Sequence, residues 1–226
     1  MQARARTAVV RGVRTSDMIV QQMKPATATS SAPDAKAGCT ATFPKLAALI
    51  GYLDTLNRRA DLARLSELLA NLDVKRSDIA PACIFGTRGY KRNTISSSPW
   101  YELLALCWHS GDCTPIHDHM GVSCAFKVVE GEGTEIRFKP TPSGLICPTG
   151  TVAMHPGYIC AADDPDIHQV ANMQAQGNDL ITLHIYSPPI KKMNTYEFAT
   201  PISSETADQY RTPMKVQGSV AEDMPC

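Results

Sequence analysis

Apolar residues recur at helical spacing in two stretches near the start of the chain. Leucine or isoleucine appears every three or four residues between positions 46 and 56, and leucine does so again between positions 62 and 72. Side chains at this spacing share one face of a helix. The pattern therefore predicts two short amphipathic helices within about residues 44–76.

Beyond Pro81 the helical spacing stops. Segments of four to eight residues follow, separated by glycine, proline, aspartate and serine, which is typical of short strands. Gly131-Glu132-Gly133 lies between two such segments and predicts a tight hairpin. Strands without intervening helices favour a closed antiparallel barrel or a jelly roll at about residues 90–200. The expected strands cover about residues 101–109, 114–119, 124–130, 133–139, 151–154, 167–171, 180–186 and 195–198.

Residues 1–41 have a different composition. They are rich in alanine, serine, threonine and arginine and hold few large apolar side chains. Such a segment cannot bury enough apolar surface to fold, so we expect a disordered or flexible leader. Its arginine-rich, acid-poor start is typical of an organelle transit peptide, but Met18 or Met23 would serve equally well as the true start. Residues 42–226 are expected to form a single domain.

The charge balance argues against some function classes. Lysine plus arginine and aspartate plus glutamate each number 22, so no net field attracts nucleic acid or an anionic membrane. No apolar run approaches the roughly 20 residues that span a bilayer.

The 8 cysteines include no Cys-x-x-Cys pair and are too few for a disulfide framework in a chain of 226 residues. They indicate thiols in a reducing cytoplasm.

His117 and His119 are the most informative residues for chemistry. In a strand, residues two apart project to the same face, so both imidazoles would point the same way. His168 would complete a set of three if its strand lay alongside. A single histidine is more often a surface or core residue than a ligand, and the pair alone supports either interpretation.

Three neutral imidazoles would not reduce the positive charge of a divalent metal. In an octahedral site they would also leave three adjacent coordination positions empty. Such a centre favours anionic, soft donors, and a thiolate with an amine from one small substrate would fill two positions. The third position suits dioxygen, which favours iron(II) over redox-silent zinc. Zinc held by three histidines for hydrolysis or hydration is the alternative.

The residues around these histidines extend the pattern. A glycine precedes His117 by six positions, Cys124 follows His119 by five, and another glycine follows seven positions later. This frame resembles the first motif of the cupin superfamily, whose double-stranded β-helix barrel holds a metal between two motifs. The second motif is matched only in part, by His168 and Asn172. Most cupins have a glutamate ligand where this chain has Cys124.

Five longer stretches resemble the cysteine dioxygenase family. They are Tyr90-Lys91-Arg92-Asn93, residues 107–119, residues 124–131, Ile167-His168-Gln169-Val170-Ala171-Asn172 and Leu183-His184-Ile185-Tyr186-Ser187-Pro188-Pro189. The resemblance covers about residues 44–200 and implies a mainly β fold, a cupin-type jelly-roll barrel with a short N-terminal helical segment. It also implies an oxidoreductase that uses Fe(2+) and O2 to convert the thiol of L-cysteine into cysteine sulfinic acid.

Carried over position by position, the resemblance implies that His117, His119 and His168 bind the iron. Arg92, with Tyr90 beside it, would bind the substrate carboxylate, because a guanidinium fork matches a carboxylate better than lysine does. Without the resemblance, Arg92 would be taken as an exposed loop residue.

The resemblance also gives roles to one strand. Thr182, His184 and Tyr186 lie two positions apart and so share a face. In the family such residues form a hydrogen-bonded row, usually with serine first, and the tyrosine hydroxyl sits over the iron. Without the resemblance, the three residues would be interpreted as buried polar side chains that hydrogen-bond to partners in the core. Cys124 matches the residue that forms a thioether with this tyrosine in many animal members; we expect the two to be close, and the crosslink stays open.

Three alternative functions stay open. One is the same oxidation of another small thiol, 3-mercaptopropionate or cysteamine; relatives that act on 3-mercaptopropionate typically have glutamine in place of Arg92. Another is a non-catalytic cupin that binds metal as a sensor or structural element, and the third is a zinc hydrolase. The expected partners are L-cysteine and O2, with no nucleic acid or membrane, and the expected state is a cytoplasmic monomer.

Overall fold

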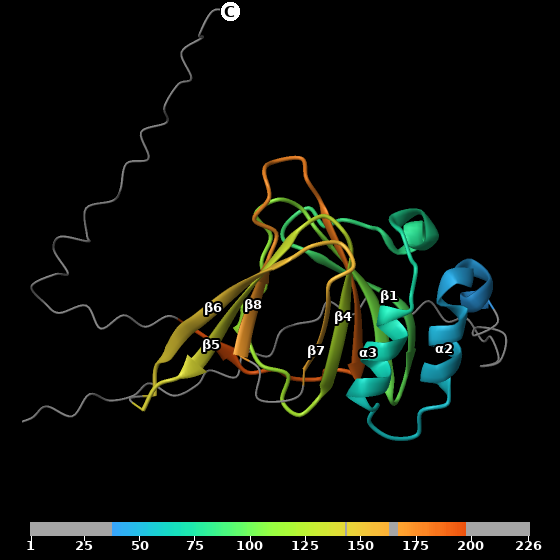
Figure 1. The fold of residues 1–226 in the computed structure, drawn as a ribbon, viewed down its shortest axis with the longest axis horizontal. Coiled ribbons are helices and arrows are strands. Elements are labelled where there is room, and N and C mark those ends of the chain that lie inside the picture. Colours follow the sequence, from blue (N-terminus) through green and yellow to red (C-terminus); the bar gives the residue numbers. More distant parts are fainter. Residues whose placement is uncertain (1–37, 143, 163–166, 198–226) are drawn as a thin grey trace, which may run out of the picture.

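Two five-stranded antiparallel sheets face each other and form the barrel (Figure 1). The structure is a computed structural model that describes residues 38–142, 144–162 and 167–197. Its strands are β1 (Lys91–Ser98), β2 (Tyr101–Trp108), β3 (Ile116–His117), β4 (Ser123–Glu130), β5 (Gly133–Pro140), β6 (Ile146–Met154), β7 (Ile159–Ala162), β8 (Ile167–Ala171), β9 (Leu180–Ser187) and β10 (Thr195–Tyr196). Sheet A has the order β1-β2-β9-β4-β7, and sheet B has the order β10-β3-β8-β5-β6.

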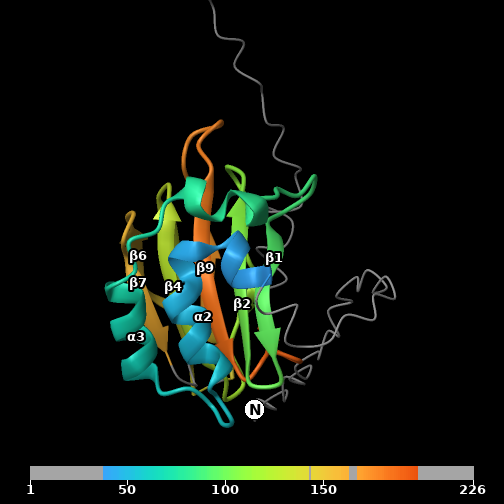
Figure 2. The ribbon, with the colours of Figure 1, turned by 90° about the vertical axis from the view of Figure 1, so that its right-hand side faces the viewer.

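Short helices cover the outer face of sheet A (Figure 2). They are η1 (Pro44–Leu46), α2 (Ala47–Asp54), α3 (Leu62–Ala70) and η2 (Arg76–Ala82). The Asp61 side chain caps α3 by accepting a hydrogen bond from the Arg64 amide at 2.8 Å. At the other end, Lys127 Nζ of β4 donates to the carbonyls of Leu69 and Leu72 at 2.8 and 2.6 Å. The two predicted helices are confirmed.

The central strands of sheet A are buried on both faces because they separate two apolar cores. On β2, Leu103 and Cys107 belong to the core under the helices. The alternate residues Leu104, Leu106 and Trp108 belong to the core between the sheets. This alternation follows from the two-residue repeat of a strand. The mainly β, jelly-roll fold with a short helical segment at its start is therefore confirmed.

Several predicted strand bounds were wrong. The strands β1 and β7 were not predicted, and β6 begins at Ile146 rather than at 151. The strand expected at 114–119 is reduced to Ile116–His117, because Met120 and Gly121 both have positive φ and turn the chain. His119 therefore lies just beyond a strand rather than inside one.

The predicted hairpin at Gly131-Glu132-Gly133 was also wrong. The strands on its two sides do not pair with each other, since β4 pairs with β7 and β9, whereas β5 pairs with β6 and β8. The turn instead carries the chain from sheet A to sheet B. Gly131 has a φ of 78°, and a Cβ there would lie 2.1 Å from the carbonyl oxygen of Asp179. The glycine is needed for the close approach of two backbones.

The ends of the chain lie largely outside the described residues. This applies to residues 1–37 of the predicted leader and to residues 198–226, which include the end of the strand expected at 195–198. Residues 38–42 are helical, and Cys39 Sγ donates to the carbonyl oxygen of Ile95 at 3.1 Å. Among the described helices, none has the length and apolar character needed to span a membrane.

Candidate active site

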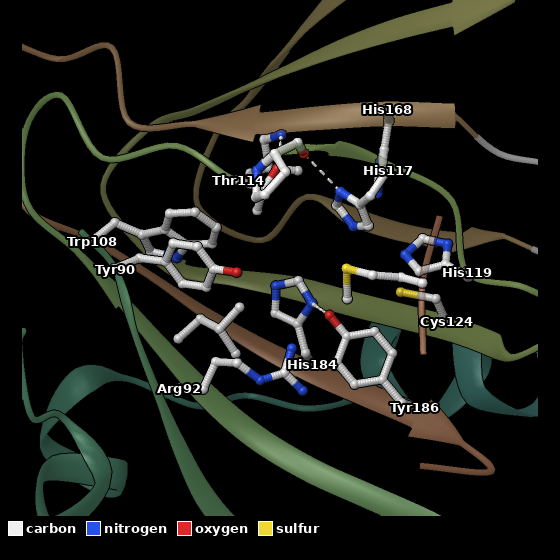
Figure 3. A pocket seen from close by; sticks show the side chains of 14 residues that line it. Tyr90, Arg92, Trp108, Thr114, His117, His119, Cys124, His168, His184 and Tyr186 are labelled. Carbon is white, nitrogen blue, oxygen red and sulfur yellow. Dashed lines mark hydrogen bonds between the residues drawn. The ribbon is translucent and has the colours of Figure 1, made fainter. Parts of the chain in front are cut away.

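Three buried histidines meet between the two sheets (Figure 3). His117 lies in β3 and is the direct register partner of His168 in β8, so the second strand does lie alongside the first. His119 follows two residues after His117. The ring centroids are 4.8 to 5.3 Å apart, and one nitrogen from each ring lies within 4.8 Å of the others. The structure therefore brings the three predicted metal ligands together.

The hydrogen bonds of these rings leave nitrogen lone pairs for a metal. His117 Nδ1 lies 2.9 Å from the carbonyl oxygen of Pro115, which only accepts, so Nδ1 carries the proton and Nε2 keeps its lone pair. His168 Nδ1 is engaged in the same way at 2.9 Å by the carboxylate of Glu135. His119 Nδ1 is buried without a hydrogen-bond partner among the described residues. A buried nitrogen of His119 without a partner, beside two other imidazoles, fits a site for a divalent transition metal.

Burial also keeps the rings in the form that binds metal. Burial, together with the neighbouring charge of His168, lowers the pKa of His117 to about 4 and the pKa of His119 to about 3. Burial has this effect because it penalises the charged imidazolium. Both rings are thus neutral near pH 7, as a ligand must be.

Glu135, on β5, was not predicted as a site residue. It is fully buried, and its second carboxylate oxygen accepts from Arg137 Nε at 2.9 Å. Burial favours a raised pKa for Glu135, but the hydrogen bonds of His168 and Arg137 outweigh it and hold that pKa below its usual value. A carboxylate on the far nitrogen of a ligating histidine fixes the ring orientation and raises its basicity.

Replacing Glu135 by glutamine should weaken metal binding by roughly 10- to 100-fold, because the charge behind His168 is lost while the side-chain size is kept. Titration of the apoprotein with Fe(II) or Co(II) measures this. Glu132→Gln is the matched control, since Glu132 is exposed and pairs only with the exposed His155 in the described structure. Equal affinity of the two variants would show that Glu135 does not support the centre.

The opposite wall of the pocket is the inner face of sheet A. Sheet A contributes Arg92 of β1, Cys124 of β4, and His184 and Tyr186 of β9 to the lining of the pocket. Tyr90 lines the pocket from the position directly before β1, and Thr182 contacts His184 from the same strand without lining the pocket. All the predicted site residues outside the histidine trio come from this wall or from its edge. Sheet B and the turn after its strand β3 supply the possible metal ligands, and sheet A supplies side chains that face them (Figure 3).

Thr182, His184 and Tyr186 form the expected hydrogen-bonded row along β9. His184 Nε2 lies 2.9 Å from Thr182 Oγ1, and His184 Nδ1 lies 3.1 Å from the Tyr186 hydroxyl. Burial, with the charge of Arg92, holds the pKa of His184 well below its usual value, so the ring is neutral and one nitrogen donates while the other accepts. The two hydrogen bonds of His184 therefore point the same way along the strand, either toward Tyr186 or toward Thr182.

Trp108 extends this row. Its indole Nε1 donates to Thr182 Oγ1 at 3.1 Å, and its ring stacks on Tyr90 with centroids 4.2 Å apart. Thr182 can then donate its own proton to His184, and in that tautomer His184 Nδ1 donates to the oxygen of Tyr186. In that arrangement the phenol proton of Tyr186 is available to the pocket.

Tyr186 and Cys124 are direct register partners across β9 and β4, as their expected proximity requires. Both are buried and belong to the core between the sheets. Burial, with the neighbouring Cys124, raises the pKa of Tyr186, so the phenol keeps its proton in neutral solution.

Arg92 projects from β1 toward Tyr186, with its Cζ 5.1 Å from the ring centroid. Its Nη2 lies 3.2 Å from the Glu102 carboxylate on β2, and its side chain is 29% exposed. Arg92 thus lines the pocket and is not the exposed loop residue that its local sequence would indicate. The Glu102 contact was not predicted.

Comparison with known proteins agrees with this geometry. The model of the family described as cysteine dioxygenase type I matches residues 35–199, which is more than half of the chain. Cysteine dioxygenase type 1 of Danio rerio is 28% identical over 117 residues, covering 49% of this chain and 57% of that protein. Cysteine dioxygenase type 1 of Rattus norvegicus is 25% identical over 173 residues, covering 71% of this chain and 86% of that protein.

Solved structures of other proteins are also similar. An uncharacterized conserved protein with a double-stranded β-helix domain from Klebsiella pneumoniae has a TM-score of 0.41 at 14% identity, over 53% of this chain and 94% of that one. An RmlC-like cupin protein from Desulfovibrio desulfuricans has a TM-score of 0.35 at 19% identity, over 47% of this chain and 90% of that one. The family match, covering both walls of the pocket, is the decisive finding: the chain belongs to the cysteine dioxygenase type I family.

Proposed function

We propose that the protein is an iron(II) dioxygenase that oxidises the thiol of L-cysteine with O2 to cysteine sulfinic acid. The observation that carries the proposal is the convergence of His117, His119 and His168 on one pocket that Arg92 also lines. Membership of the family and the histidine trio together support a non-haem, metal-dependent dioxygenase. The choice of iron and of L-cysteine is our proposal.

The charges of the pocket select its ligand. The three histidines would hold the metal, and iron(II) would supply the redox chemistry that lets dioxygen react with a thiolate. No carboxylate is among these ligands, so the centre favours a substrate that brings negative charge. A thiolate at one end and a carboxylate at the other satisfy both the metal and Arg92.

The side chains of sheet A orient the substrate and hold protons. Arg92 would bind the carboxylate through its planar fork, which fixes the position of the thiol relative to the histidines. Tyr186, kept protonated by burial, would donate a hydrogen bond to substrate atoms in the pocket, and His184 would hold its oxygen in place. Both oxygen atoms of O2 end on sulfur, and the thiol supplies all four electrons, so no external reductant is needed.

Protein purified without oxygen, loaded with Fe(II) and given L-cysteine should consume one O2 for each cysteine sulfinate formed. An oxygen electrode and product identification by mass spectrometry measure this, with the zinc-loaded protein as the control. No turnover by the iron-loaded protein would contradict the proposal. Higher kcat/KM for 3-mercaptopropionate or cysteamine would keep the chemistry but change the substrate. A cytoplasmic location and a monomeric state stay predictions from the sequence.

A further inference from the structure

Arg92 already has an anionic partner inside the protein. Glu102 Oε2 lies 3.2 Å from Arg92 Nη2, and the two side chains are only 23% and 29% exposed. A partly buried guanidinium needs such a counter-charge, because a buried charge without one is strongly destabilising. Glu102 therefore stabilises Arg92 before any substrate binds.

The position of Glu102 brings its charge close to the pocket. It is the direct register partner of Tyr186 across β2 and β9. By the strand repeat it shares the inner face of sheet A with Leu104 and Leu106, which belong to the core between the sheets. Glu102 is thus a carboxylate on the pocket side of sheet A, next to two residues that line the pocket.

The geometry of the guanidinium makes Glu102 a competitor of the substrate carboxylate. An arginine offers a carboxylate two bidentate edges, Nε with Nη2 and Nη1 with Nη2, so Nη2 belongs to both. A substrate carboxylate must displace Glu102 from Nη2 or bind at the other edge beside it. Either way, the negative charge of Glu102 lowers the affinity for the substrate carboxylate.

We propose that Glu102 is the resident counter-ion of Arg92 and sets the affinity of the pocket for thiols that carry a carboxylate. The proposal rests on the proposed function, in which Arg92 receives that carboxylate. Glu102 acts through Arg92 and is a positioning and specificity residue. It tunes how strongly L-cysteine is preferred over cysteamine, which is the same molecule without the carboxylate.

Glu102→Gln should lower KM for L-cysteine by roughly three- to tenfold, the range expected for a partly screened charge, and change KM for cysteamine by less than about twofold. The glutamine keeps an oxygen that can accept from Arg92 and removes only the charge. Steady-state oxygen uptake with both thiols on the iron-loaded protein gives the two KM values. Glu67→Gln is the matched control, because it breaks an exposed ion pair with Arg64 on α3, and neither residue lines the pocket.

Thermal unfolding gives a second measurement that does not depend on turnover. Without oxygen, L-cysteine should raise the Tm of Glu102→Gln more than that of the wild type, since the substrate carboxylate then replaces the missing counter-charge. Cysteamine should raise both equally. A higher KM for L-cysteine in Glu102→Gln, or equal effects on both thiols, would overturn the proposal. A wild type that oxidises neither thiol would instead contradict the proposed function, and the role of Glu102 with it.

Discussion

His119→Ala is expected to abolish stable metal binding and to lower kcat/KM for L-cysteine by at least about a thousandfold, since a catalytic metal contributes several kcal/mol and each 1.36 kcal/mol is tenfold in rate. His119 is 1% exposed, and its Nδ1 has no hydrogen-bond partner in the described structure, so the substitution removes no hydrogen bond from that nitrogen. Metal analysis of the purified variant and oxygen uptake measure the two effects.

His155→Ala is the control for the loss of a histidine. The side chain of His155 is 68% exposed and pairs with Glu132 outside the pocket. This variant should keep its metal and its activity. Near-ultraviolet circular dichroism of His119→Ala separates a lost ligand from a lost fold. A folded His119→Ala protein with one tightly bound metal and normal turnover would contradict the assignment of the trio.

Arg92→Gln is expected to lower kcat/KM for L-cysteine by roughly 30- to 1000-fold, which corresponds to about 2–4 kcal/mol for a lost charge-assisted, bidentate pair. The same change should alter kcat/KM for cysteamine by less than about fivefold, because cysteamine has no carboxylate for the guanidinium. Oxygen uptake with the two thiols, compared for wild type and variant, measures this difference.

Arg64→Gln removes an arginine from an exposed ion pair on α3 and serves as the control. It should leave both thiols unaffected. If Arg92→Gln reduced the turnover of both thiols equally, the residue would act on the pocket through its contacts with Tyr186 and Glu102, and the assignment to the substrate carboxylate would be wrong.

The sequence pattern predicted those parts of the site that depend on local geometry. Thr182, His184 and Tyr186 share a face because a strand repeats every two residues, and the strand is present as expected. From the sequence, His168 could complete the set of three only if its strand lay beside that of His117. The register of β3 and β8 shows that it does. Arg92 was placed through the resemblance to a known family, because its own surroundings resemble a loop.

Contacts between distant strands could not be predicted in the same way. Gly131 and Gly133 indicate a turn. No local feature of the sequence shows whether β5 pairs with β4 or crosses to the other sheet. Glu135 looks like any polar residue of a strand until β5 and β8 place it behind His168. Glu102 likewise acquires its role only from the register of β1, β2 and β9.

The separate origin of the two pocket walls has a consequence for how such proteins diversify. His117, His168 and Glu135 belong to sheet B and His119 follows its strand β3, whereas Arg92, Glu102 and Tyr186 belong to sheet A. Substitutions in sheet A can therefore change which compound binds while the three histidines stay as they are. A change of substrate selectivity is thus compatible with retention of the proposed metal site, and a designer can explore new substrates by varying a single sheet.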